Sequence, residues 1–226
     1  MSEPELRDDT DVALWSDPSG TYDVVAEAYA KKFVDELDHK PFDRDILTRF
    51  AATVAPRASK DRPVCDLGCG PGHIGAFVSE RGVEVLGVDL SIGMVSQARR
   101  TFPWLRFTQG DMTALDRPDG SLAGIVCFYA LIHLPRVRVP VALAEMNRTV
   151  EEGGGLLLAV HGGEGSLHAN EMLEHPVSLD ATLFSLSELS ELVTAGGFEV
   201  KEAHERPPHE QELATQRLYV WATKKS

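Results

Sequence analysis

Apolar positions along the chain follow two spacings, short continuous runs and recurrences at three and four residues. The runs predict buried strands at 63–67, 82–89, 105–109, 123–129, 156–160, 198–203 and 217–222. The recurrences predict helices between them, with Ser91 and Ser185 as N-caps and Pro140 opening a third helix that Gly153–Gly155 ends. This alternation predicts an α/β fold: a seven-stranded, mostly parallel, doubly wound sheet with helices on both faces. The last two strands lack a helix between them, so we expect a C-terminal antiparallel hairpin.

Two helices precede the first of these strands. One is indicated by an apolar stripe at helical spacing, after a break in the chain at 17–20: Tyr22, Val25, Tyr29, Phe33 and Leu37. Pro41 opens the second, which extends to about Ala55. We therefore expect an N-terminal helical cap, or lid, over residues 1–58 and a core over 59–226 within a single domain. The first dozen residues carry no such pattern, and we expect them to be frayed.

The segment 161–183 interrupts the regular alternation. It contains three histidines and several acids between a strand and the helix after Ser185. Loops that follow strand carboxyl ends line the ligand crevice of an open parallel sheet. We therefore expect this insertion to lie over the site, opposite the N-terminal helices.

Composition narrows the function classes. The 226 residues include 22 Lys and Arg against 35 Asp and Glu, giving a net charge of −13. Such an acidic balance disfavours nucleic acid and anionic membranes as partners, because both select clustered basic residues. The acidic, polar residues 1–10 show no signal-peptide core, no run of about 18 apolar residues exists, and three cysteines suit a reducing compartment, so we expect a cytoplasmic protein.

A glycine-rich loop follows the first predicted strand and opens a helix. Gly68, Gly70 and Gly72 remove side chains where a ligand must approach the backbone. Read from Gly70, the segment also satisfies the G-x-G-x-x-G dinucleotide pattern, which is weak evidence by itself. Asp66, at the strand end just before the loop, would repel a pyrophosphate and attract an ammonium group.

Two further acids follow the next two strands. Asp89 ends the second strand, where a carboxylate can accept both hydroxyls of a ribose. Asp111, after the third strand, suits an adenine amino group. Ammonium, ribose and adenine in this order describe S-adenosylmethionine better than NAD.

These segments resemble the motifs of class I S-adenosylmethionine-dependent methyltransferases, of the type that acts on small molecules. The resemblance covers roughly residues 60–160 and rests on four segments: Val64–Gly72, Val88–Ser91 with Met94, Gln109–Met112 and Phe128–Leu134. It implies methyl transfer from S-adenosyl-L-methionine, with S-adenosyl-L-homocysteine as product, to a small-molecule acceptor by a monomer or homodimer. It also implies cofactor-binding roles for a defined set: Tyr22, Tyr29, Asp66, Gly68, Gly70, Asp89, Leu90, Met94, Asp111, Met112 and Phe128. In this set Phe128 would lie beneath the sulfonium, and either tyrosine could close over the methionine carboxylate.

A general base is needed only if the acceptor arrives protonated. His133, His161 and His168 are the candidates, since all three are predicted at or beyond strand ends and imidazole titrates near working pH. The resemblance places His133 best, His133 and His161 are taken as the catalytic residues, and Glu171 is a weaker alternative. The sequence offers no convincing metal-ligand set, and we expect none to be used. Two alternatives stay open: a non-catalytic S-adenosylmethionine-binding protein, and an NAD-dependent oxidoreductase, for which no Tyr-x-x-x-Lys pair is present.

Overall fold

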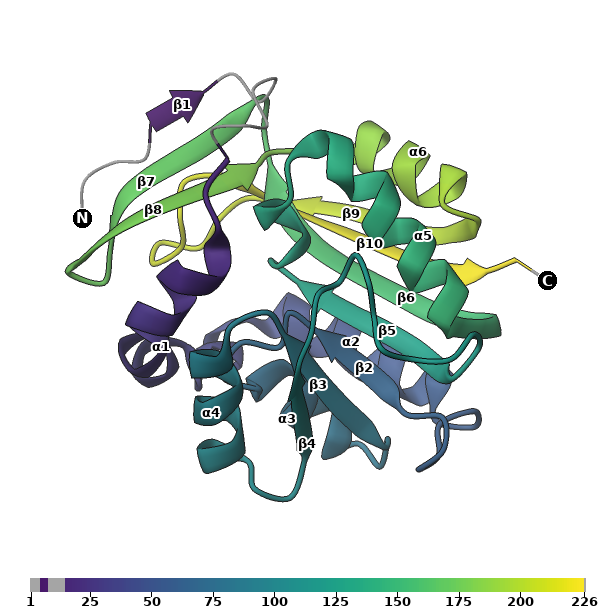
Figure 1. Cartoon of the computed structure of the whole chain (residues 1–226). Coiled ribbons are helices and arrows are strands. Elements are labelled where there is room, and N and C mark those ends of the chain that lie inside the picture. The colour runs from purple at the N-terminus through teal and green to yellow at the C-terminus, as the bar shows by residue number, and fades with distance from the viewer. Residues whose placement is uncertain (1–4, 8–14, 226) are drawn as a thin grey trace.

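The computed structural model describes residues 5–7 and 15–225. Its large sheet has seven strands in the order β4-β3-β2-β5-β6-β10-β9 (Figure 1). They are β2 (Val64–Leu67), β3 (Val85–Asp89), β4 (Arg106–Gln109), β5 (Leu122–Phe128), β6 (Val150–Gly162), β9 (Phe198–Arg206) and β10 (Gln216–Lys224). The predicted α/β class and seven-stranded sheet are confirmed.

The direction of the strands also follows the prediction. β2 pairs in parallel with β3 and β5, and the parallel pairing continues outward to β4 and β6. β10 runs antiparallel to both β6 and β9, so the last two strands form the expected hairpin. The reversal of strand order beside β2 places a crevice at the carboxyl ends of β2, β3 and β5.

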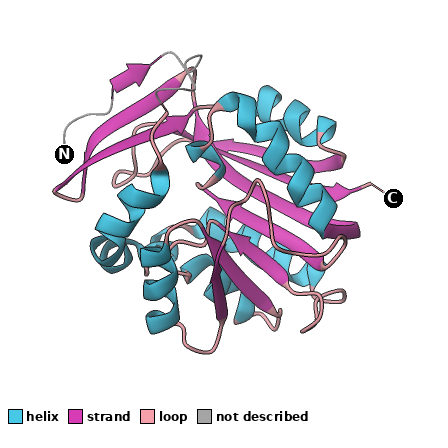
Figure 2. Ribbon diagram, viewed as in Figure 1, coloured by secondary structure: helices cyan, strands magenta, loops and turns pink. Residues whose placement is uncertain are grey.

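Helices cover both faces of this sheet (Figure 2). The apolar residues of α2 (Pro41–Val54) and α3 (His73–Ser79) pack on one face, and those of α5 (Val139–Thr149) and α6 (Leu186–Ala195) on the other. α4 (Ile92–Thr101) packs on β3 and β4. The Ser91 and Ser185 hydroxyls accept hydrogen bonds from the third amides of α4 and α6, as N-caps do. Short 3₁₀ turns stand at Glu36–His39, Leu131–His133 and Arg136–Arg138.

The N-terminal helix α1 (Pro18–Phe33) lies across the carboxyl end of the sheet, beside α4. The expected break at 17–20 is wrong, because Pro18 occupies the first turn of the helix and Asp17 caps it by accepting a hydrogen bond from the Ser19 amide at 2.9 Å. The helical stripe therefore begins four residues earlier than the apolar pattern suggested.

The insertion forms a second sheet that the sequence did not predict. β7 (Ser166–Met172) and β8 (His175–Thr182) make an antiparallel hairpin, and β1 (Glu5–Arg7) pairs with β7. β8 packs against α1, so the insertion lies beside the N-terminal helices and not opposite them, contrary to the expectation. Residues 5–7 are paired and not frayed, while the rest of the first dozen lies outside the described residues.

The glycines at 153–155 do not end α5, which stops at Thr149. They lie within β6, at a register shift where β6 meets β5. A Cβ at Gly155 would stand 2.7 Å from the ring of Phe50, so this glycine lets α2 approach the sheet closely. A Cβ at Gly154 would stand 2.8 Å from the Ala123 carbonyl oxygen, and Gly153 has a positive φ of 72°. Close approach and backbone conformation, and not helix termination, account for this run.

Within the described ranges, every helix is too short or too polar to cross a bilayer.

Candidate active site

A pocket opens at the carboxyl ends of β2, β3, β4 and β5, beneath α1. The space between its lining side chains, part of it open to solvent, is about 740 Å³. The lining comes from five separate segments: Pro18, Ser19, Tyr22, Tyr29, Leu67, Gly68, Gly70, Asp89, Leu90, Ser91, Met94, Gly110, Asp111, Met112, Phe128, Tyr129, Ala130, His133 and Leu134. Eleven of the thirteen predicted site residues therefore meet in one cavity, and Asp66 and His161 do not line it.

The glycine loop supplies a bare backbone wall. Gly68 and Gly70 have φ of 70° and 52°, in the left-handed region that favours glycine. A Cβ at Gly68 would lie 2.1 Å from the Ala130 Cβ, whereas a Cβ at Gly70 would meet no atom within 4 Å. The first glycine therefore permits close packing of two strand ends, and the second leaves open space at the pocket.

Asp89 stands at the end of β3 with its carboxylate fixed by the backbone. Its two oxygens accept hydrogen bonds from the Gly70 amide at 2.7 Å and the Ser91 amide at 2.8 Å. Burial raises the pKa of this carboxyl, and the two amide hydrogen bonds oppose the rise. Each carboxylate oxygen has a second lone pair, so the group can still accept hydrogen bonds from a ligand.

The far end of the pocket combines apolar walls with one acid. Leu90, Met94 and Met112 provide flat apolar surface, and the Met94 side chain is fully buried. The Asp111 carboxylate accepts hydrogen bonds from the Thr113 amide at 2.7 Å and the Thr113 hydroxyl at 2.8 Å, and the residue is exposed. An apolar slot with a polar edge suits a planar heterocycle.

The lid helix closes over the pocket with two tyrosines. Tyr22 and Tyr29 pack edge to face, with ring centroids 5.7 Å apart, and burial raises the pKa of both phenols. Asp23 attaches the lid to the start of α4, accepting hydrogen bonds from the Ser91 hydroxyl at 2.5 Å and the Gly93 amide at 2.8 Å. The lid is therefore docked on the same turn that follows Asp89.

Asp66 lies behind the glycine loop and not in the pocket wall. Its side chain is 1% exposed, and its Oδ2 accepts a hydrogen bond from the Gly75 amide of α3 at 2.8 Å. Burial raises its pKa to about 7. Its role toward a ligand ammonium stays a prediction, now one that would act across the loop.

His133 is the candidate base that reaches the pocket. Its Nδ1 donates to the Asp180 carbonyl at 2.9 Å, since a carbonyl can only accept. The neutral ring then presents Nε2 as an acceptor, 2.8 Å from the Tyr22 hydroxyl. Burial lowers the pKa of His133, so the ring is neutral near pH 7 and carries its lone pair on the pocket side.

The other candidate bases are elsewhere. His161 packs its ring against Tyr129, outside the pocket lining. Its pKa is lowered to about 3, mainly by burial and also by the positive charge of the nearby Arg217. His168 is buried against Asp180 at 2.6 Å, and Glu171 lies on β7 away from the lining. Across residues 5–7 and 15–225, no three His, Cys, Asp or Glu side chains gather as a metal site would require.

Some residues at or near the site carry no local sequence pattern that predicts their position there. Tyr129 adopts a φ of 56°, rare for a non-glycine residue, and its position directly after a central strand was the available clue. Pro18 and Ser19 enter the lining because α1 starts early. Asp180 comes from the insertion, where nothing in the local pattern indicated a contact with His133.

This geometry is that of a nucleoside-binding pocket on a Rossmann-like sheet. Comparison with known proteins indicates which nucleoside cofactor the pocket would bind. A family model described as a methyltransferase domain matches residues 64–154. A demethylmenaquinone methyltransferase of Beutenbergia cavernae is 34% identical over 144 residues, covering 63% of this chain and 57% of that protein. A trans-aconitate 2-methyltransferase of Methylobacterium nodulans is 32% identical, covering 68% and 64%. The chain spans about half the length of the curated relatives it matches.

Solved structures agree on the fold. The Burkholderia thailandensis 1,6-didemethyltoxoflavin-N1-methyltransferase, solved with its acceptor and S-adenosylhomocysteine, superposes with a TM-score of 0.62 at 20% identity, covering all of both chains. Residues 64–154 therefore form a region similar to the methyltransferase domain family, and the fold is shared with solved S-adenosylmethionine-dependent methyltransferases.

Proposed function

We propose that the protein transfers the methyl group of S-adenosyl-L-methionine to a small-molecule acceptor. The observation that carries this proposal is the Asp89 carboxylate, held by two backbone amides at the mouth of the glycine loop. A carboxylate so fixed is preorganised to accept two vicinal hydroxyl groups.

The residues of the pocket fit the cofactor along its length. Asp89 would hold the ribose, and Leu90, Met94 and Met112 would pack on the adenine with Asp111 at its edge. The open backbone at Gly70 would receive the methionine part, with Gly68 beside it and the Asp66 charge behind. Tyr22 and Tyr29 would cover this part, and Phe128 would lie beneath the sulfonium. Bound there, S-adenosylmethionine supplies an electrophilic methyl group.

The protein's own contribution is orientation, exclusion of water and, for a protonated acceptor, a base. The docked lid covers the pocket through Tyr22 and Tyr29, which removes water from the reacting atoms. His133 Nε2 is the acceptor on the pocket side, and an acceptor hydroxyl that replaced the Tyr22 hydroxyl there could pass its proton to it. Such proton transfer is our proposal for phenol-like or alcohol-like acceptors.

The class of acceptor is part of the proposal. The matched relatives act on a demethylmenaquinone, a malonyl-acyl carrier protein and a trans-aconitate, according to their names, so no single acceptor carries over. The net charge of −13 favours small molecules over nucleic acid.

Thermal shift and calorimetry test the cofactor assignment. S-adenosylmethionine and S-adenosylhomocysteine should raise the melting temperature by mass action, while NADH should not. Asp89→Ala should weaken S-adenosylmethionine binding at least about tenfold, as expected for lost hydrogen bonds to a charged group. Asp61 is exposed, so Asp61→Ala is the matched control and should bind S-adenosylmethionine with wild-type affinity. Unchanged affinity in Asp89→Ala would refute the assignment, and binding without turnover over a broad acceptor panel would favour a non-catalytic protein.

A further inference from the structure

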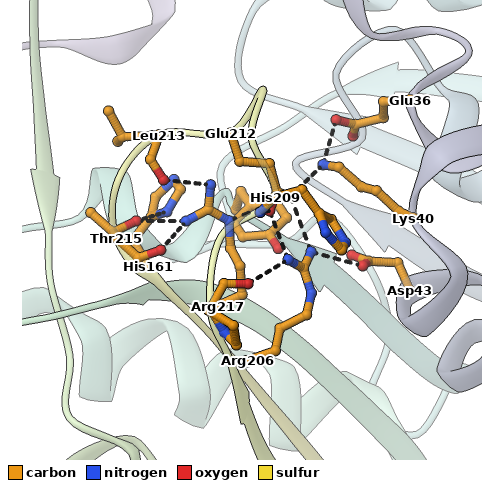
Figure 3. A network of polar contacts seen from close by, with 12 residues as sticks. Glu36, Lys40, Asp43, His161, Arg206, His209, Glu212, Leu213, Thr215 and Arg217 are labelled. Carbon is orange, nitrogen blue, oxygen red and sulfur yellow. Dashed lines mark hydrogen bonds and ion pairs between the residues drawn. The ribbon is translucent and has the colours of Figure 1, made fainter.

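Beyond the pocket, on the far side of Tyr129, three cations converge on one carboxylate. Glu212 lies in the loop between β9 and β10, and its side chain is 7% exposed (Figure 3). Arg206 Nη1 and Nη2 donate to its two oxygens at 2.7 and 3.0 Å, the paired geometry of a guanidinium on a carboxylate. Lys40 Nζ lies 3.2 Å and Arg217 Nε 3.7 Å from Glu212 Oε1. The position is therefore shaped for a planar carboxylate.

Without Glu212, this cluster of charged side chains would carry a net positive charge. Lys40 also pairs with Glu36 at 2.7 Å, and Arg206 also pairs with Asp43 at 3.0 Å. Three cations thus face two other carboxylates, so removal of Glu212 leaves one positive charge unbalanced. The side chains of the three cations are only 4–13% exposed. A buried, unbalanced positive charge strongly favours the entry of one anion.

The segment that carries Glu212 is attached by polar contacts. Every residue from 207 to 215 is at least partly exposed, so the loop anchors no fully buried apolar side chain. Besides the Glu212 cluster, its attachments include hydrogen bonds from Arg217 to the Leu213 carbonyl at 3.1 Å and to the Thr215 carbonyl at 2.6 Å. The Thr215 hydroxyl also hydrogen-bonds His161 at 2.8 Å, and Arg206 donates to the Pro207 carbonyl at 3.2 Å. Polar contacts of this kind can be exchanged for those of a ligand without exposing a hydrophobic core.

The ring of Tyr129 lies between this cluster and the proposed methyl-transfer pocket. Tyr129 lines the pocket, while the Lys40 Nζ and the Arg217 guanidinium carbon lie 5.7 and 5.8 Å from its ring centroid. An acceptor that occupies the pocket beside Tyr129 could extend a short chain past this ring to the cations.

We propose that these three cations form the binding site for a carboxylate group of the acceptor, and that Glu212 occupies this site until the acceptor displaces it. The inference rests on the proposed function, because it names the class of acceptor, a small carboxylic acid. In the free protein the Glu212 loop closes the acceptor end. Entry of the acceptor carboxylate replaces the ion pairs of Glu212 with its own and releases the loop.

The test uses citrate as the probe, trimethyl citrate as its neutral counterpart and inorganic phosphate as another anion, all at constant ionic strength. Glu212→Gln should bind citrate about tenfold more tightly than the wild type, because a neutral amide competes less for the cations. Glu210→Gln, an exposed position in the same loop, should match the wild type. Equal citrate affinity in the wild type and Glu212→Gln overturns the proposal.

Hydrogen exchange on the wild-type protein gives a readout that does not depend on the variant folding. The His209 amide donates to Glu212 at 2.8 Å, so displacement of Glu212 by citrate should speed its exchange. A purely structural ion-pair cluster predicts no change with citrate. Phosphate acting as strongly as citrate would overturn the assignment to a carboxylate.

Failure of this inference is separable from failure of the proposed function. S-adenosylhomocysteine binding is measured on the same samples. A protein that binds S-adenosylhomocysteine but shows no citrate effect contradicts only the carboxylate site. A protein that responds to citrate but binds no S-adenosyl nucleoside contradicts the methyltransferase proposal.

Discussion

The buried Asp66 should lower folding stability while strengthening binding of a cationic ligand, and Asp66→Asn separates the two effects. Burial raises the pKa of Asp66 from its ordinary value to about 7, and the Gly75 amide opposes the rise only in part. The folded protein therefore holds a proton on this group between pH 4 and 7 that the unfolded chain has released. Folding stability from this group must then fall as pH rises through that window, and the loss is complete above the folded pKa.

The magnitude follows from the size of the shift. One pKa unit corresponds to about 1.4 kcal/mol, so the rise from pH 5 to the folded pKa near 7 removes about 3 kcal/mol. Asparagine keeps an acceptor for the Gly75 amide but does not ionise. The stability advantage of Asp66→Asn over the wild type should therefore grow by about 3 kcal/mol between pH 5 and 8.

Urea denaturation at pH 5, 6, 7 and 8 measures this difference, with Asp61→Asn as the exposed control. Calorimetry on the same variant tests the ligand side with two ligands. At pH 8, where the wild-type Asp66 carboxyl is ionised, S-adenosylmethionine carries an ammonium and should bind about tenfold more weakly to Asp66→Asn. Adenosine, which lacks the ammonium, should bind both proteins equally. Stability curves that stay parallel across pH would refute the buried-charge reasoning. Equal loss for both ligands would show that Asp66 acts only by shaping the loop.

The remaining predictions concern the loop glycines and the base. Gly68→Ala should lower the free energy of unfolding by about 3 kcal/mol or more, because φ is positive and the new Cβ would overlap that of Ala130. Gly70→Ala should lower it by only about 1 kcal/mol yet weaken S-adenosylmethionine binding. Urea titration and calorimetry compare the two variants, and equal stability losses would contradict the packing argument. His133→Ala should reduce turnover of a hydroxyl acceptor about 100-fold and abolish the acidic limb of the pH–rate profile, which its lowered pKa places below pH 6.5. Unchanged turnover together with an unchanged profile from about pH 4 to 9 would make His133 a structural residue.

The sequence predicted the features that depend on local patterns. Buried parallel strands are continuous apolar runs, and helix starts carry side-chain caps such as Ser91 and Ser185, so the large sheet and its helices could be predicted. The gathering of acids at one edge of the sheet could also be predicted, because the carboxyl ends of adjacent parallel strands meet there. Asp89 ends β3 and Asp111 follows β4, and both line the pocket, while their roles toward the cofactor stay predictions.

The features that failed depend on contacts between distant segments. The β7–β8 hairpin turns through Leu173 and Glu174, both with positive φ, and neither residue type signals such a turn. Its strands are only partly buried, so their apolar alternation is weak. His161 follows a predicted strand end just as His133 does, yet in the structure it lies within β6 and packs on Tyr129. No local spacing distinguishes the two histidines. The cluster around Glu212 joins α2, two strands and a loop, and only the folded structure brings these together.

The part of the chain with no recognisable motif nevertheless determines the chemistry available at His133. The backbone carbonyl of Asp180 on β8 accepts a hydrogen bond from His133 Nδ1. The Asp180 carboxylate accepts a hydrogen bond from the Ser16 amide at 2.8 Å and hydrogen-bonds His168 at 2.6 Å. The chain just before the lid, the hairpin and the candidate base are thus joined at one residue. Because the carbonyl fixes the tautomer, the hairpin decides which nitrogen faces the pocket. If His133 acts as the proposed base, its proton transfer would therefore depend on the second sheet, whereas Asp89 and the glycine loop belong to the large one.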